Sequence, residues 1–94
     1  MAVGDIVSAV VSLTNASSYY MQATSGNEWV IHNIYHPRNI DLRWFNNGVL
    51  VGSVGTLTGP NIQTNLQFHL TNSIFIVIGC NSAQVIGYDG VVTK

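Results

Sequence analysis

Residues that could carry out chemistry gather in one stretch of the chain, from Glu28 to Phe45. This stretch contains both tryptophans, two of the three histidines, both arginines and two of the four acids. Histidine and carboxylate side chains act as acids, bases and metal ligands, and arginine binds carboxylates and other anions. The stretch is therefore the first candidate for a functional site.

His32 and His36 suggest a metal site, but their spacing argues against it. On a predicted strand they share one face and lie about 13 Å apart, because each residue advances a strand by about 3.3 Å. One ion cannot bind both. A zinc site would need His69 or symmetry-related copies of the chain. We predict no metal site.

The other residues that could act in catalysis form no recognisable pattern. A catalytic triad needs a nucleophile, a base and an orienting acid, and no nucleophile-elbow motif accompanies the serines and histidines. The four acids are scattered beside predicted strands and turns, with Asp89-Gly90 expected to form a turn. No glycine-rich phosphate loop precedes a helix. The sequence therefore predicts no catalytic residue, no cofactor and no enzyme activity.

The chain carries few charges. Asp, Glu, Lys and Arg make up 7% of its 94 residues, whereas soluble domains usually contain about 25%. Arg38, Arg43 and Lys94 are the only Arg and Lys residues, too few for general nucleic-acid binding or for an anionic lipid surface. No apolar run approaches the roughly 20 residues that span a bilayer, and the start lacks the basic region of a secretory signal. We expect neither a nucleic-acid nor a membrane partner.

Low charge also gives little protection against association. We therefore expect a defined oligomer, or docking on a larger assembly; the alternative is a monomer solvated by amides and hydroxyls. Cys80 has no second cysteine to pair with and follows an apolar run, so it is expected to be a small buried side chain.

Turn residues recur at intervals of about ten positions, between β-branched and aromatic runs. This pattern predicts a single domain, residues 1–94, that forms an all-β antiparallel sandwich of about eight short strands. A jelly-roll-like order is expected, although another Greek-key sandwich fits equally well. The expected strands cover residues 5–13, 18–23, 29–35, 41–45, 49–54, 64–70, 74–78 and 83–89.

Three local features of these strands are specific. Asn46-Asn47-Gly48 predicts a type I′ hairpin, because both central residues of that turn take positive φ. The strand at 74–78 is apolar on both faces and should be central. The strands at 29–35 and 41–45 are expected to be partners, joined by a turn at Pro37-Arg38-Asn39.

The strand at 29–35 carries bulky side chains on both faces, so we expect one face to meet the core and the other to meet a partner. Core packing should account for at least half of the aromatic residues, and the exposed ones would stack on sugar rings or anchor a protein interface. The predicted interface residues are Trp29, His32, His36, Arg38, Arg43, Trp44, Tyr19 and Tyr20.

Three segments resemble small virion proteins of tailed bacteriophages: Met1 to Ser8, Asn27 to His36 and Val85 to Val91. The resemblance implies a short all-β chain, typically trimeric, that is made in the host cytoplasm. It implies a non-enzymatic protein that decorates and cements the capsid exterior, with copies of itself and the major capsid protein as partners. The alternative is a receptor- or carbohydrate-binding module of a phage fibre or tail tip, with a host surface glycan as partner.

Overall fold

The computed structural model describes residues 2–94, with Val54 described by its backbone alone. Within this range the chain folds into nine strands and no helix, so no helix of the described residues could cross a membrane. The strands are β1 (Ile6–Leu13), β2 (Ser18–Met21), β3 (Trp29–His36), β4 (Ile40–Asn46), β5 (Val49–Leu57), β6 (Asn61–Gln63), β7 (Phe68–Leu70), β8 (Ile74–Cys80) and β9 (Gln84–Val92).

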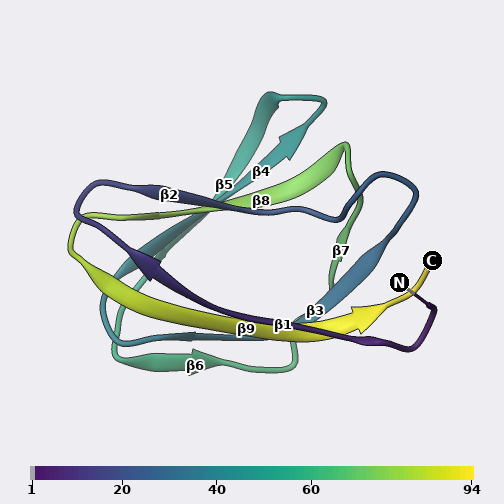
Figure 1. Ribbon diagram of the computed structural model, residues 1–94. Helices are drawn as coiled ribbons and strands as arrows, with labels where there is room; N and C mark the ends of the chain where they lie inside the picture. Colours follow the sequence, from purple (N-terminus) through teal and green to yellow (C-terminus); the bar gives the residue numbers. More distant parts are fainter. Residues whose placement is uncertain (1) are drawn as a thin grey trace.

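The strands form two antiparallel sheets packed face to face (Figure 1). Sheet A has the order β1-β9-β3-β6, with β7 also paired to β3, and sheet B has the order β2-β8-β4-β5. If β6 and β7 are counted as one interrupted strand, the strand orders of the two sheets are those of an eight-stranded jelly roll. The predicted antiparallel sandwich is confirmed. So is the central position of residues 74–78, because β8 lies between β2 and β4.

The core lies between the two sheets and is almost entirely apolar. Alternation places Val7, Ala9, Val11 and Leu13 of β1 on the inner face, as their spacing predicts. The largest side chains that are fully buried are Met21, Ile31, Ile34, Ile40, Leu42, Leu70, Ile76, Ile78, Ile86 and Val92. Cys80 is buried among them as a free thiol, as expected.

The strands β3 and β4 are not partners, so this prediction was wrong. β3 pairs with β9, β6 and β7 in sheet A, whereas β4 pairs with β5 and β8 in sheet B. A tight hairpin needs positive φ in its turn, and residues 37–39 have none. The turn therefore carries the chain from one sheet to the other instead of folding it back on itself.

A β-bulge in β3 changes which side chains face the core. The register with β9 shifts between Ile31 and Asn33, which inserts one extra residue and reverses the alternation. Consequently His32 is exposed on the outer face of sheet A, while His36 is buried with 2% of its surface accessible. The prediction that these two histidines share a face was wrong.

Several strand boundaries also differ from the prediction: β2 ends at Met21, β5 runs on to Leu57, and β6 lies outside the expected strands. The strand expected at 64–70 is reduced to β7, because Asn65 adopts a φ of 58°, which a continuous strand cannot contain. Asp89-Gly90 is not a turn but lies inside β9, which runs on to Val92. An added Cβ on Gly90 would meet the backbone of β3, so this glycine serves close strand packing.

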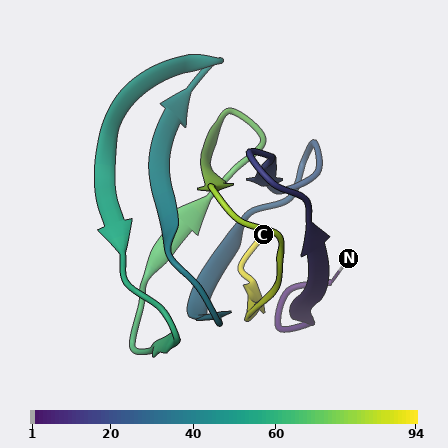
Figure 2. The same ribbon diagram turned by 90° about the vertical axis from the view of Figure 1, so that its left-hand side faces the viewer.

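The Asn47-Gly48 hairpin is confirmed. Asn47 and Gly48 have φ values of 52° and 79°, and Asn46 pairs directly with Val49. The end of this β4–β5 hairpin projects beyond the rest of the sandwich (Figures 1 and 2). We call residues 44–51 the arm.

Candidate functional site

Strand register places a row of side chains across the outer face of sheet A. Val10 faces Gly87, Gly87 faces Tyr35, and Tyr35 faces Ile62. Val10 is 81% exposed, Ile62 56% and Tyr35 38%. With Pro37, Pro60 and Val85, they line an apolar groove of about 750 Å³.

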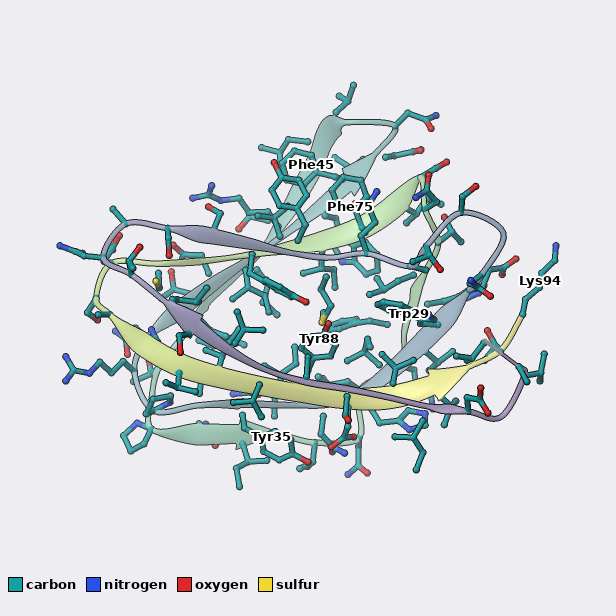
Figure 3. All side chains as sticks on the ribbon, viewed as in Figure 1. Trp29, Tyr35, Phe45, Phe75, Tyr88 and Lys94 are labelled. Atoms are coloured by element: carbon teal, nitrogen blue, oxygen red, sulfur yellow. The ribbon has the colours of Figure 1, made fainter. Side chains whose placement is uncertain are left out.

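Gly87 gives the Tyr35 ring room to lie against the sheet. An added Cβ on Gly87 would be 3.5 Å from Cδ2 of Tyr35 and 3.4 Å from the carbonyl oxygen of Ala9. Figure 3 shows Tyr35 on the outside of sheet A, whereas Tyr88 and Trp29 lie between the sheets. The ring is thus a partly exposed aromatic surface beside the apolar groove.

Asp89 fixes this ring and connects it to a polar row. The Tyr35 hydroxyl donates to Oδ2 of Asp89, and Nδ2 of Asn33 donates to Oδ1 at 2.7 Å. The hydrogen bond to Asp89, with some desolvation and the carboxylate charge, raises the pKa of Tyr35. Ser8 faces Asp89 from β1, and a cavity of about 350 Å³ lies between Ser8, Val10, Tyr35 and Asp89.

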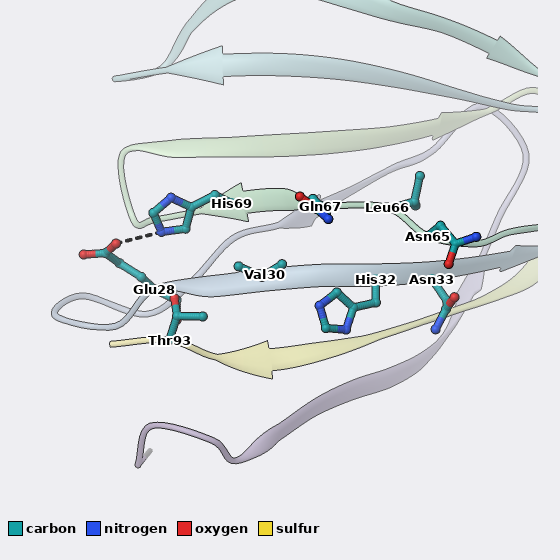
Figure 4. Close-up of a pocket in the computed structure, with 9 residues that line it drawn as sticks. All are labelled: Glu28, Val30, His32, Asn33, Asn65, Leu66, Gln67, His69 and Thr93. Carbon is teal, nitrogen blue, oxygen red and sulfur yellow. Dashed lines mark hydrogen bonds and ion pairs between the residues drawn. The ribbon is translucent and has the colours of Figure 1, made fainter.

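A polar pocket of about 830 Å³ lies further along the same face (Figure 4). Its main contact joins Nε2 of His69 to Oε1 of Glu28 at 2.7 Å, and Nζ of Lys94 is 3.6 Å from Oε2 of Glu28. His32 also lines the pocket. Among residues 2–94 no group of three His, Cys, Asp or Glu side chains is placed to hold a metal ion. The pocket thus contains an exposed contact of Glu28 with His69 and Lys94.

The outer face of sheet B carries an aromatic cluster. Phe45 and Phe75 stack with ring centroids 5.6 Å apart and planes 2° apart, and Tyr20 contacts Phe75 at 5.6 Å. Phe45 and Phe75 lie on the outside of this sheet in Figure 3. Tyr20 is 57% exposed. Phe45 belongs to the arm, whose Val49, Leu50 and Val51 are 66%, 53% and 68% exposed.

The predicted interface residues are divided between the core and several surfaces. Trp29 and His36 are buried, so their side chains do not reach a partner in this fold. Nδ1 of His36 donates to the carbonyl of Arg38 at 2.9 Å, and its Nε2 accepts from Gln63 at 3.3 Å. These contacts give His36 a role in holding the β3–β4 turn.

Trp44 and Tyr19 are half-buried and pack inward. Trp44 meets Phe68 edge to face at 5.6 Å, and the Tyr19 hydroxyl lies 2.8 Å from that of Tyr88. Burial, together with this hydrogen bond, raises the pKa of Tyr88. Trp44 is therefore no exposed platform for a ligand.

The remaining predicted residues, Tyr20, His32, Arg38 and Arg43, are exposed but do not form one surface. His32 lies on sheet A, Tyr20 and Arg43 on sheet B, and Arg38 in the turn between β3 and β4. Sequence reasoning missed the Tyr35–Asp89 group. The outward-facing Ile6 and Val10 of β1 were a signal that this sheet presents apolar residues to its surroundings.

The chain matches no known protein-family model, and no characterised protein is detectably similar to it in sequence.

Proposed function

We propose that this chain is a non-enzymatic assembly subunit that associates with copies of itself, as a trimer, and decorates and cements a bacteriophage capsid. The observation that carries the proposal is the arm. It projects from the sandwich and presents three large apolar side chains, each more than half exposed. A partner that covers them would gain about 25 cal/mol for each Å² of apolar surface removed from water.

The charge distribution supports the same conclusion. No Asp, Glu, Lys or Arg occurs between Arg43 and Asp89, so the tip of the arm and most of sheet B carry no formal charge. Charged side chains are one of the main devices by which proteins prevent unwanted association. Their absence around an exposed apolar projection favours a permanent contact.

Side chains of the arm, rather than its backbone edge, are the expected contact. β5 is an edge strand, but its register with β4 shifts twice, between Leu42 and Arg43 and between Trp44 and Phe45. Bulges of this kind twist an edge and hinder the addition of a further strand. The apolar tip at Val49 to Val51 therefore supplies the surface for association.

The capsid role is supported by the three segments that resemble phage virion proteins and by the fold, since jelly rolls are frequent in viral capsids. A subunit that binds only the assembled shell stabilises that shell by mass action. A rigid sandwich with an uncharged projection suits such a role, because it adds apolar contacts without chemistry.

The first experiment measures the mass of the protein in solution by size exclusion with light scattering. We expect a trimer for the natural chain and a monomer for Leu50→Asn. Val85→Asn is the matched control, because Val85 is 52% exposed and Leu50 53%, but Val85 lies on sheet A. A natural chain that stays monomeric at all concentrations would contradict self-association.

The second experiment locates the protein on phage particles that contain it. Gold-labelled antibody is expected on the head, and shells that lack the protein are expected to rupture at lower temperature. Label confined to the tail, or equal rupture temperatures with and without the protein, would argue against cementing.

A further inference from the structure

We propose that the outer face of sheet A binds a neutral sugar, with the Tyr35 ring as its platform and Asp89 and Ser8 as its hydrogen-bonding groups. This face is separate from the arm, so the proposal does not depend on how the protein assembles. The residues concerned belong neither to the hydrophobic core nor to the arm.

The platform comes from an aromatic ring and a glycine on neighbouring strands. Gly87 leaves a gap in the row between Val10 and Tyr35, and the Tyr35 ring lies beside that gap. The apolar face of a sugar ring, which presents C–H groups, packs well on a flat aromatic surface of this kind. The bond from its hydroxyl to Asp89 holds the ring in place before a ligand arrives.

The polar groups beside the ring have hydrogen-bonding capacity left over. A carboxylate accepts at about four positions, and the bonds from Tyr35 and Asn33 occupy two of those of Asp89. The Ser8 hydroxyl, which lines the same cavity opposite Asp89, both donates and accepts. Sugar hydroxyls need this mixture of donors and acceptors close to an apolar surface.

The surroundings limit the class of sugar. No Lys or Arg appears among the described residues that line the 350 Å³ cavity or the adjoining 750 Å³ groove, whereas Asp89 contributes a negative charge. An acidic sugar would be repelled without compensation, so a neutral hexose or N-acetylhexosamine is expected. Both volumes fall in the range of about 300 to 1,000 Å³ that is typical of small-molecule sites.

The two spaces share Val10, Tyr35 and Gly87, which gives the site two parts. The cavity beside Asp89 fits the hydroxyl-rich side of a sugar. The groove over Ile62, Val85 and Pro60 fits an apolar substituent or a second ring. A disaccharide is therefore expected to bind more tightly than its monosaccharide.

Nuclear magnetic resonance titration of the full chain tests the site. The probes are the methyl glycosides of glucose, galactose and N-acetylglucosamine, with N-acetylneuraminic acid as the anionic counter-probe. At least one neutral probe is expected to shift the backbone amides of Asn33, Gly87 and Asp89, and the anionic probe is expected to shift none. No shift with any neutral probe, or an equal response to the anionic one, would overturn the proposal.

Substitutions separate a binding role from a purely structural one. Tyr35→Ala is expected to weaken binding about tenfold or more, whereas Tyr20→Ala, which removes an exposed ring on the other sheet, is expected to leave it unchanged. Ser8→Lys keeps the fold, because Ser8 is exposed, but places an ammonium group opposite Asp89 and is expected to abolish binding. Unchanged affinity in Ser8→Lys and Tyr35→Ala, or equal loss in Tyr20→Ala, would refute the site.

Discussion

Gly90 lies where β9 comes very close to the backbone of β3, next to the bulge. A methyl group added to it would sit 2.0 Å from the carbonyl oxygen of Val30 and 2.8 Å from Cα of Ile31. Both atoms belong to the backbone of a central strand, so neither can rotate away. Because Cβ atoms essentially never approach closer than 3.0 Å, Gly90→Ala requires a separation of at least 1.0 Å (3.0 − 2.0).

Such a separation breaks hydrogen bonds on both sides of the bulge. A backbone N···O distance of about 2.9 Å would become about 3.9 Å, which is longer than any N–H···O hydrogen bond. Each lost bond costs about 1 kcal/mol, and the loosened packing of Ile31 adds to this. We expect a loss of about 3 kcal/mol or more. A chain of this length has a total free energy of unfolding of about 5 to 14 kcal/mol, so the effect is a large fraction of it.

Urea unfolding followed by tryptophan fluorescence measures this loss, because buried Trp29 and half-buried Trp44 both change surroundings on unfolding. The matched control is Gly79→Ala in central β8, where an added Cβ meets nothing within 4 Å. The control is expected to be unchanged or more stable by up to about 1 kcal/mol. In thermal melts, Gly90→Ala should lower Tm by about 12 to 24 °C. A Gly90→Ala variant within about 1 kcal/mol of the control would refute the close approach of β9 to β3.

Two further predictions concern the alkaline stability and the hairpin. Burial and the hydrogen bond to Tyr19 raise the pKa of Tyr88 above its ordinary 10.0. Tyr88 therefore loses its proton at a lower pH in the unfolded chain than in the folded one. The contribution of Tyr88 to stability is therefore complete below about pH 10 and is lost as pH rises further. Above about pH 10, the melting temperature of Tyr88→Phe should fall less steeply with rising pH than that of the natural chain. Equal slopes for the two proteins would contradict this. Gly48→Ala, at a φ of 79°, should cost about 1 to 2 kcal/mol, whereas Gly52→Ala in β5 should cost less; equal melting temperatures would argue against the type I′ turn.

Features that depend on neighbouring residues were predictable from the sequence. The Asn47-Gly48 turn and the burial of Cys80 both follow from local chemistry, and both are confirmed. The central position of β8 follows from apolar residues on both of its faces. In each case the physical cause, a positive φ or a run of apolar residues, is contained in a few adjacent residues.

The candidate site was not predictable in the same way. Asp89 precedes a glycine and was expected to form a turn, because Asp-Gly often does. Only the pairing of β9 with β3 brings its carboxylate to Asn33 and Tyr35, which are more than 50 residues away in sequence. Likewise, His32 and His36 were assigned to one face because a strand alternates regularly, and the bulge that separates them depends on the register with β9.

The sequence by itself determined that this chain is an all-β sandwich with few charges and a tight hairpin, because strand alternation, turn preference and composition act locally. The tertiary structure decided that Glu28 to Phe45 is not one site. Its two strands join opposite sheets, Trp29 and His36 enter the core, and Tyr35 meets Asp89 on the outer face of sheet A. The physical reason is that a strand's hydrogen-bonding partners are chosen by competition among all the strands, and that choice fixes which distant side chains come together.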